Sequence, residues 1–163
     1  MPAGPLREPV AEGLARADAV ILMEPDTCDV AASLKDLDIP VIRARLTPLP
    51  SAQRLIGRKV IAFAGIGRPE KFFETLSGMG CDLVATRAFA DHHPYTSDEV
   101  MKLLEDAAAA GAIAVTTEKD AVRLPSEARD IVRTLSVTLE WRDEAALDRL
   151  LIPALSPALT TRA

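Results

Sequence analysis

An alternation of short apolar runs with helix-like segments, which begins at residue 59, is the feature that most restricts the fold of this chain. Short, continuous apolar runs are typical of strands that are covered on both faces of a parallel sheet. The order predicts an α/β fold of the Rossmann-like kind, with an open, mostly parallel sheet and helices on both faces. The expected strands are 59–64, 81–86, 112–117 and 137–141, and the expected helices are 69–76, 97–110, 126–135 and 143–151.

Two further β-α elements precede this region. The strands are expected at 19–23 and 39–46, and the helices at 10–16 and 29–37. The segment 47–53 that follows carries two prolines and polar residues, which is typical of a linker between domains. We therefore expect a first unit over 1–47, a hinge or linker over 48–57, a smaller α/β domain over 58–152 and a tail over 153–163.

The composition narrows the class of protein. A chain of 163 residues with 48% hydrophobic residues can bury a sizeable core. The net charge of −5 comes from interspersed acidic and basic residues, so we expect no nucleic-acid partner. Cys28 and Cys81 are isolated and are expected to be reduced, buried thiols in a cytosolic protein, without a metal site. No apolar run is long enough to predict a membrane span, although association with a membrane surface stays open.

The segment Phe89–Tyr95 concentrates the reactive side chains of the chain, because it holds both of its histidines. It follows an expected strand and precedes an expected helix, which places it at the carboxyl edge of the sheet, where open α/β sheets bind ligands. Imidazole exchanges protons near neutral pH, and Asp91 beside His92 can orient it or raise its basicity. The alternative is a polar turn anchored by Pro94.

Two other loops are expected at the same edge. Gly65 and Gly67 stand between a strand and a helix, where backbone amides can approach an anion, or where close packing alone requires glycine. Glu118, Lys119 and Asp120 follow another strand and either orient a catalytic group or cap the next helix, of which capping is the expectation.

Near the N-terminus, a proline-dense stretch carries Arg7 and Glu8. Prolines exclude a central strand and a helix interior, so we expect a rigid loop that presents these two charges as ligand groups. A surface ion pair is the alternative.

With these residues in view, the sequence resembles the tetraacyldisaccharide 4′-kinases, the lipid A kinases of Gram-negative bacteria, which are related to P-loop kinases. The resemblance rests on separated motifs that occur in the order of the family. They are Pro2–Pro9, Arg16–Val20, Ala62–Pro69 with Phe72 and Phe73, Phe89–Tyr95 and Thr116–Val122.

The resemblance implies transfer of a phosphoryl group from ATP, with Mg²⁺, to the 4′-hydroxyl of a membrane-embedded tetraacyldisaccharide 1-phosphate lipid. It implies a cytoplasmic enzyme at the inner-membrane surface with two α/β domains joined by a hinge. His92 matches the catalytic histidine, Asp91 matches a residue implicated in activity, and Arg7 and Glu8 match residues near the nucleotide. Gly65, Gly67, Glu118, Lys119 and Asp120 are expected to bind substrate or support the site.

The sequence departs from the family pattern in its missing front half. It has no Gly-rich loop ending in Lys-Ser/Thr, which cradles phosphates in such kinases. The resemblance also implies that the catalytic histidine pairs with an aspartate of the N-terminal domain, and that aspartate is missing as well. We therefore expect 1–47 to be the end of the nucleotide-binding domain, and the chain to be inactive unless an N-terminal kinase half completes it. The alternative is a non-catalytic α/β module that binds an anionic headgroup or a partner protein.

Overall fold

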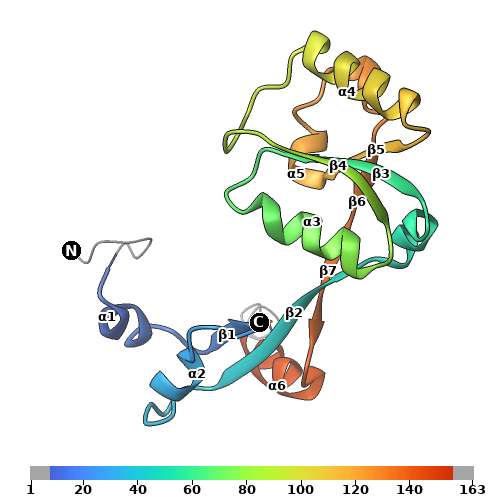
Figure 1. Ribbon diagram of the computed structural model, residues 1–163. Helices are drawn as coiled ribbons and strands as arrows, with labels where there is room; N and C mark the ends of the chain where they lie inside the picture. The colour runs from blue at the N-terminus through green and yellow to red at the C-terminus, as the bar shows by residue number, and fades with distance from the viewer. Residues whose placement is uncertain (1–7, 156–163) are drawn as a thin grey trace, which may run out of the picture. The chain divides into compact units, whose positions relative to one another are not determined.

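The computed structural model describes residues 8–155 (Figure 1). Contacts divide the chain into two compact units, one formed by Met1–Thr47 with Leu139–Ala163 and the other by Pro48–Thr138. The second unit begins and ends earlier than the domain expected over 58–152. It ends earlier because strand β7 (Val137–Trp141) is a neighbour of strand β2 (Val41–Pro48) in the sheet of the first unit. The limits of the domains in the whole protein stay a prediction.

The second unit contains a parallel sheet of the predicted kind. Its strand order is β4-β3-β5-β6, and β3 pairs in parallel with β4 on one side and with β5 on the other. Strand β6 pairs in parallel with β5. The α/β fold with an open parallel sheet is thus confirmed. The strands are β3 (Lys59–Ala64), β4 (Asp82–Ala88), β5 (Ile113–Thr117) and β6 (Arg133–Leu135).

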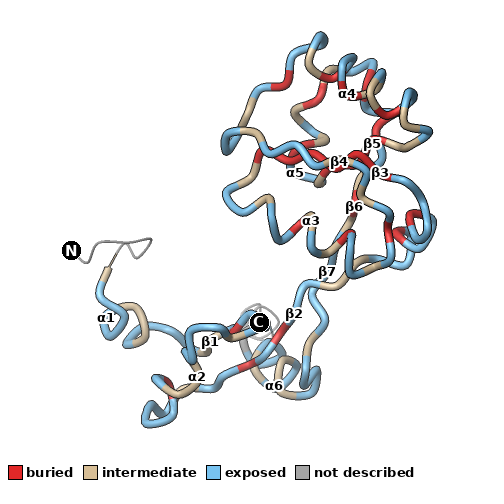
Figure 2. Tube along the Cα trace, in the orientation of Figure 1, coloured by how far each residue is buried: buried red, intermediate tan, exposed pale blue. Residues whose placement is uncertain are grey.

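Helices cover both faces of this sheet, because alternate side chains of the buried strand β3 enter two separate apolar clusters. Val60, Ala62 and Ala64 pack with residues of helix α3 (Pro69–Gly78) and of the short 3₁₀ helix η1 (Pro50–Leu55). Ile61 and Phe63 pack with residues of α4 (Ser97–Ala109) and η2 (Ser126–Ala128) on the other face. Figure 2 shows the buried residues gathered along these central strands.

Two segments depart from the expected elements. The helix expected over 126–135 is wrong, since η2 occupies only its first residues and β6 its last ones. The hydrogen bonds of β6 with β5 and the burial of Val132 and Leu135 decide this, and both depend on tertiary contacts. The segment expected as a linker contains η1, whose Ala52 and Leu55 are buried in the core.

The first unit is built around a small sheet with the strand order β1-β2-β7, in which β1 and β2 are parallel. Cys28 is exposed here, so the expectation that both thiols are buried holds for Cys81 alone. In the described part of the chain, no helix is both long and apolar enough to cross a lipid bilayer. The remaining elements are α1 (Val10–Leu14), β1 (Val20–Met23), α2 (Val30–Ser33) and α6 (Glu144–Leu155), together with α5 (Glu118–Ala121) in the second unit.

Candidate functional site

The loop that carries both histidines lies where the sequence predicts it, between the end of β4 and the start of α4. Its end is fixed by a capping box, in which the Thr96 hydroxyl accepts from the Glu99 amide and the Glu99 carboxylate accepts from the Thr96 amide. Its middle is fixed by the His92 amide, which donates to the Gly65 carbonyl oxygen at 3.0 Å. The loop is therefore tied to the carboxyl end of β3 as well as to β4.

Asp91 and His92 face an open pocket at this edge of the sheet. His92 adopts a left-handed backbone conformation with φ of 60°, and its side chain is 83% exposed. Its Nε2 atom lies 3.8 Å from Oδ2 of Asp91, which is too long for a hydrogen bond but close enough for charge attraction. The pocket has a volume of about 430 Å³ and is lined by Ile66, Gly67, Asp91, His92, Lys119, Val122 and Arg123.

His93 has different surroundings from His92. Its Nε2 atom lies 3.0 Å from a carboxylate oxygen of Glu99, and its ring stacks on Phe89 with centroids 4.8 Å apart. Hydrogen bonds from the Thr96 amide, from His93 and from the Thr96 hydroxyl hold the pKa of Glu99 below its usual range. His93 is thus part of the packing that supports the loop, and His92 is the histidine at the pocket.

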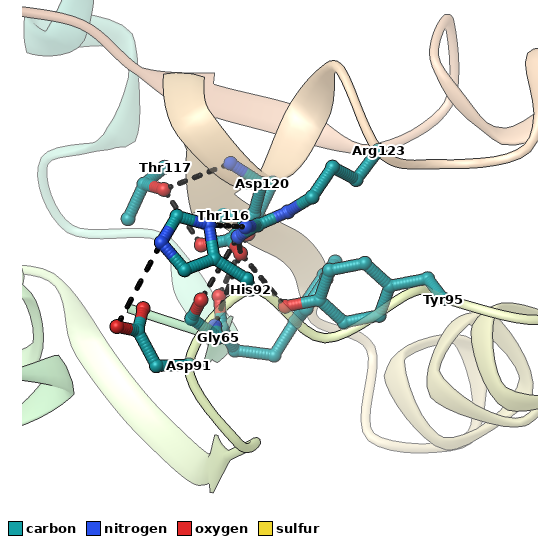
Figure 3. Close-up of polar contacts among 9 residues, drawn as sticks. Gly65, Asp91, His92, Tyr95, Thr116, Thr117, Asp120 and Arg123 are labelled. Carbon is teal, nitrogen blue, oxygen red and sulfur yellow. Dashed lines mark hydrogen bonds and ion pairs between the residues drawn. The ribbon is translucent and has the colours of Figure 1, made fainter. Parts of the chain in front are cut away.

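Asp120 lies beneath the pocket and has no exposed side-chain surface. Its carboxylate accepts hydrogen bonds from the Gly65 amide at 3.1 Å, the Tyr95 hydroxyl at 3.0 Å and the Thr117 hydroxyl at 2.6 Å, and it also pairs with Arg123 (Figure 3). A buried charge requires such a complete set of partners. Asp120 therefore ties together the ends of β3, the histidine loop and α5.

Glu118 and Asp120 lie in the first turn of α5, where the sequence predicts acidic residues at a helix start, but the side chain that caps the helix belongs to another residue. Thr117 precedes α5, and its hydroxyl accepts a hydrogen bond from the Asp120 amide at 3.1 Å. The carboxylate of Asp120 instead turns inward to Gly65 and Tyr95. For Asp120, the alternative of orienting neighbouring groups of the site is the one that fits the geometry.

The two glycines of the loop after β3 differ in their surroundings. A Cβ atom on Gly65 would lie 3.0 Å from the Ala90 carbonyl oxygen and 3.1 Å from both the His93 Cβ and the Tyr95 hydroxyl. Close packing therefore explains Gly65, as the second interpretation of this loop expects. Gly67 is exposed and lines the pocket, where a Cβ atom would meet only Asp91, at 3.7 Å.

The structure places only one of the other described candidate residues at the pocket. Lys119 lines the pocket with Asp91 and His92, whereas Glu118 is exposed and is not among the lining residues. Glu8 lies in the other unit, where hydrogen bonds from Arg16 hold its pKa below the usual range. Arg7 lies outside the described residues. The ion-pair interpretation of Glu8 therefore describes its contact with Arg16.

The site also contains four residues for which the sequence pattern predicted no role, namely Tyr95, Thr116, Thr117 and Arg123. Arg123 stands three residues after Asp120, and this spacing brings two side chains together on one turn of a helix. The spacing is the sequence signal from which the pairing of Arg123 with Asp120 could have been predicted. Burial, and secondarily the charge of Asp120, raises the pKa of Tyr95 above its usual range, so its hydroxyl stays a donor. Thr116 is buried and donates to the Phe63 carbonyl oxygen at 2.8 Å.

Comparison with known proteins links this chain to one family. The model of the tetraacyldisaccharide-1-P 4′-kinase family matches residues 1–156. A tetraacyldisaccharide 4′-kinase of Rhodospirillum centenum is 55% identical over 96% of this chain and 46% of the relative, and one of Rhodospirillum rubrum is 48% identical over 95% and 49%. The chain thus spans about half the length of these relatives.

A solved structure gives the same result for the fold. The LpxK protein of Aquifex aeolicus, crystallised in complex with ATP, is 26% identical and superimposes with a TM-score of 0.63. The match covers 94% of this chain and 47% of that protein. The motifs, the parallel sheet and the family match agree, and this chain belongs to the tetraacyldisaccharide-1-P 4′-kinase family.

Proposed function

We propose that this chain is the C-terminal portion of a lipid A 4′-kinase, which transfers a phosphoryl group from ATP to the 4′-hydroxyl of a tetraacyldisaccharide 1-phosphate. The observation that carries the proposal is the pocket at the sheet edge, which brings Asp91 and His92 of one family motif beside Lys119 of another. A non-catalytic module has no need for these groups to converge. The lipid substrate implies that the working enzyme lies at the cytoplasmic surface of the inner membrane.

The side chains of the pocket suit this chemistry. Phosphoryl transfer depends on positioning and on stabilising the charge of the phosphoryl oxygens. The Lys119 ammonium group supplies positive charge at the pocket wall. His92 is exposed at the same wall, where it can exchange a proton or hydrogen-bond with an oxygen near the reacting alcohol. Asp91 lies on the other side of the imidazole, with its Oδ2 atom 3.8 Å from Nε2.

The described residues do not by themselves fit MgATP. The sequence has no Gly-rich loop ending in Lys-Ser/Thr, and residues 8–155 contain no group of three or more His, Cys, Asp or Glu side chains that could hold a metal ion. Glu8 is engaged by Arg16. In this proposal, the nucleotide and Mg²⁺ are bound mainly by an N-terminal half like that of the relatives, and this chain supplies the other side of the site.

A chimera tests the proposal. The N-terminal part of the Rhodospirillum centenum relative is joined to residue 1 of this chain, and transfer of labelled phosphate from ATP to tetraacyldisaccharide 1-phosphate is measured. We expect the chimera to phosphorylate the lipid and the isolated chain to show neither phosphorylation nor micromolar binding of MgATP by calorimetry.

The controls separate a wrong proposal from a faulty chimera. The intact relative serves as the positive control, and a chimera that carries His92→Ala serves as the negative one. A chimera that is folded and binds ATP but does not phosphorylate the lipid contradicts the proposal and favours a non-catalytic module that binds an anionic headgroup.

A further inference from the structure

Arg123 connects the buried carboxylate of Asp120 to the exposed imidazole of His92. Its Nη2 group donates to the Gly65 carbonyl oxygen at 2.9 Å and pairs with Oδ1 of Asp120. Its Nη1 group lies 3.1 Å from Nδ1 of His92 (Figure 3). One rigid, planar guanidinium group therefore contacts the buried part and the exposed part of the site at once.

The two terminal nitrogens of Arg123 contact different residues, which shows that neutralising Asp120 is not the whole role of this arginine. An arginine that serves only as a counter-ion commonly places both of its terminal nitrogens on the carboxylate. Here only Nη2 contacts Asp120, while Nη1 is directed to His92. The Nε atom is buried without a hydrogen-bond partner among the described residues. An unsatisfied buried donor is destabilising, so this geometry is not the most stable one for the Arg123–Asp120 pair alone.

The contact with Arg123 also decides which nitrogen of His92 carries the proton. A guanidinium group has donors only and stays charged, so Nδ1 of a neutral His92 must be the acceptor. The proton of the neutral ring is then on Nε2, which is the nitrogen nearer to Asp91. His92 thus presents an N–H donor, and not a lone pair, to an anionic oxygen in the pocket.

Little else holds the imidazole in place. Its side chain is 83% exposed, so packing contributes little to its orientation. The His92 amide donates to the Gly65 carbonyl oxygen, which also accepts from Nη2 of Arg123. The Gly65 carbonyl group therefore positions both parts of His92. It accepts a hydrogen bond from the His92 backbone directly, and it holds the His92 side chain through Arg123.

We propose that Arg123 is a positioning residue that holds the His92 imidazole at the pocket and fixes its neutral form with the proton on Nε2. Asp120 is the buried anchor of Arg123. The catalytic meaning of this arrangement rests on the proposed kinase function, whereas the arrangement itself is a property of this chain and can be tested without activity.

Nuclear magnetic resonance of the chain, with ¹⁵N-labelled histidine, tests the arrangement directly. At a pH at which the imidazole is neutral, we expect His92 to show one side-chain rotamer, a proton on Nε2 and a through-space contact to the Arg123 guanidinium. A His92 ring that is rotationally averaged in the unmodified chain, with no contact to Arg123, overturns the proposal, and this measurement requires no variant.

Two variants separate positioning from stability. Arg123→Lys keeps a positive charge near Asp120 but cannot reach both Asp120 and His92, and Arg123→Gln removes the charge. In both we expect His92 to become rotationally averaged with mixed protonation of its two nitrogens, while His93, which contacts Glu99, keeps its signals as an internal control. Arg87→Lys is the matched control, because Arg87 pairs with Asp106 elsewhere in the same unit. Unchanged His92 signals in a folded Arg123→Lys chain contradict the proposal.

The active chimera provides a second readout. Arg123→Lys should lower kcat with little change in KM, and it should cause little further loss when His92 is already alanine, because the two residues act as one unit. Equal losses from Arg123→Lys with and without His92 would show that the arginine acts independently. An inactive chimera contradicts the kinase proposal alone, and the resonance measurements still decide the role of Arg123.

Discussion

The hydroxyl group of Tyr95 donates a 3.0 Å hydrogen bond to Oδ1 of Asp120, a carboxylate with no exposed surface. The bond joins the histidine loop to helix α5, so the candidate site depends on a contact made beneath it. The Tyr95 ring also packs edge-on against Phe63 and Phe89, with centroid distances of 5.5 and 5.2 Å. Stability and site geometry are therefore coupled through these residues.

Tyr95→Phe should keep the ring packing and remove one donor to Asp120. A hydrogen bond to a charged group contributes about 1.5–3 kcal/mol, so we expect a loss of that order in the free energy of unfolding, measured with urea. The same change in an Asp120→Asn chain should cost less, since the buried charge is gone. Equal costs in both backgrounds would show that the Tyr95 hydroxyl does not act through Asp120.

Gly65→Ala should destabilise the chain because the added methyl group has no space between the Ala90 carbonyl oxygen and His93. Overpacking of this kind costs about 1–3 kcal/mol. Gly78→Ala is the matched control, because a Cβ atom there meets nothing within 4 Å and the residue lies in α3. Thermal unfolding should show a lower midpoint for Gly65→Ala only. The interpretation of Gly65 as a packing residue fails if both variants behave alike.

Acid should weaken the histidine loop through Glu99. The folded pKa of this carboxyl is below its usual range, so its contribution to stability is complete above the unfolded pKa of about 4.3 and is lost as the pH falls through the lower folded pKa. Glu99→Gln keeps the capping shape without titrating. Urea unfolding at neutral pH and near pH 3 should show a smaller loss on acidification for the variant. An equal loss would assign the acid sensitivity to other groups.

The first unit should promote self-association. Ile21 and Met23 of β1 are 50% and 42% exposed, and β1 is at the edge of its sheet in the described part of the chain. An exposed apolar edge pairs readily with another chain. Light scattering should show oligomers that decrease with Ile21→Lys. Met101→Lys is the control, since Met101 is even more exposed, at 57%, but lies on a helix. A monomer at all concentrations would contradict this prediction.

The two histidines should differ in their effect on catalysis by the active chimera. Proton transfer or hydrogen bonding by a positioned side chain is worth about 10²–10⁴-fold in rate. We expect His92→Ala to lower kcat by that order, with a smaller effect on KM. His93→Ala should act mainly on stability, because His93 contacts Glu99 and Phe89 away from the pocket lining. A dominant effect of His93 would reverse the assignment within the pair.

Much of the second unit could be predicted from local pattern. The apolar runs at β3 and β5 lie on strands that are covered on both faces. Short, continuous apolar runs between turn residues identify such strands without tertiary information. A segment whose local pattern is ambiguous was assigned to the wrong element. Residues 126–135 have helical spacing, yet Leu135 lies in β6 because β5 offers a free edge for pairing.

The sequence by itself determined the family, the parallel α/β sheet and the position of Asp91 and His92 at its carboxyl edge, because motifs and strand ends are local properties. Only the tertiary structure decided that His92 and Lys119 share a pocket, that His93 turns to Glu99, and that Asp120 holds Arg123 against the imidazole. The reason is physical. Asp120 and Gly65 are 55 residues apart, and the directions of side chains at such separations depend on burial and hydrogen bonding in the folded chain.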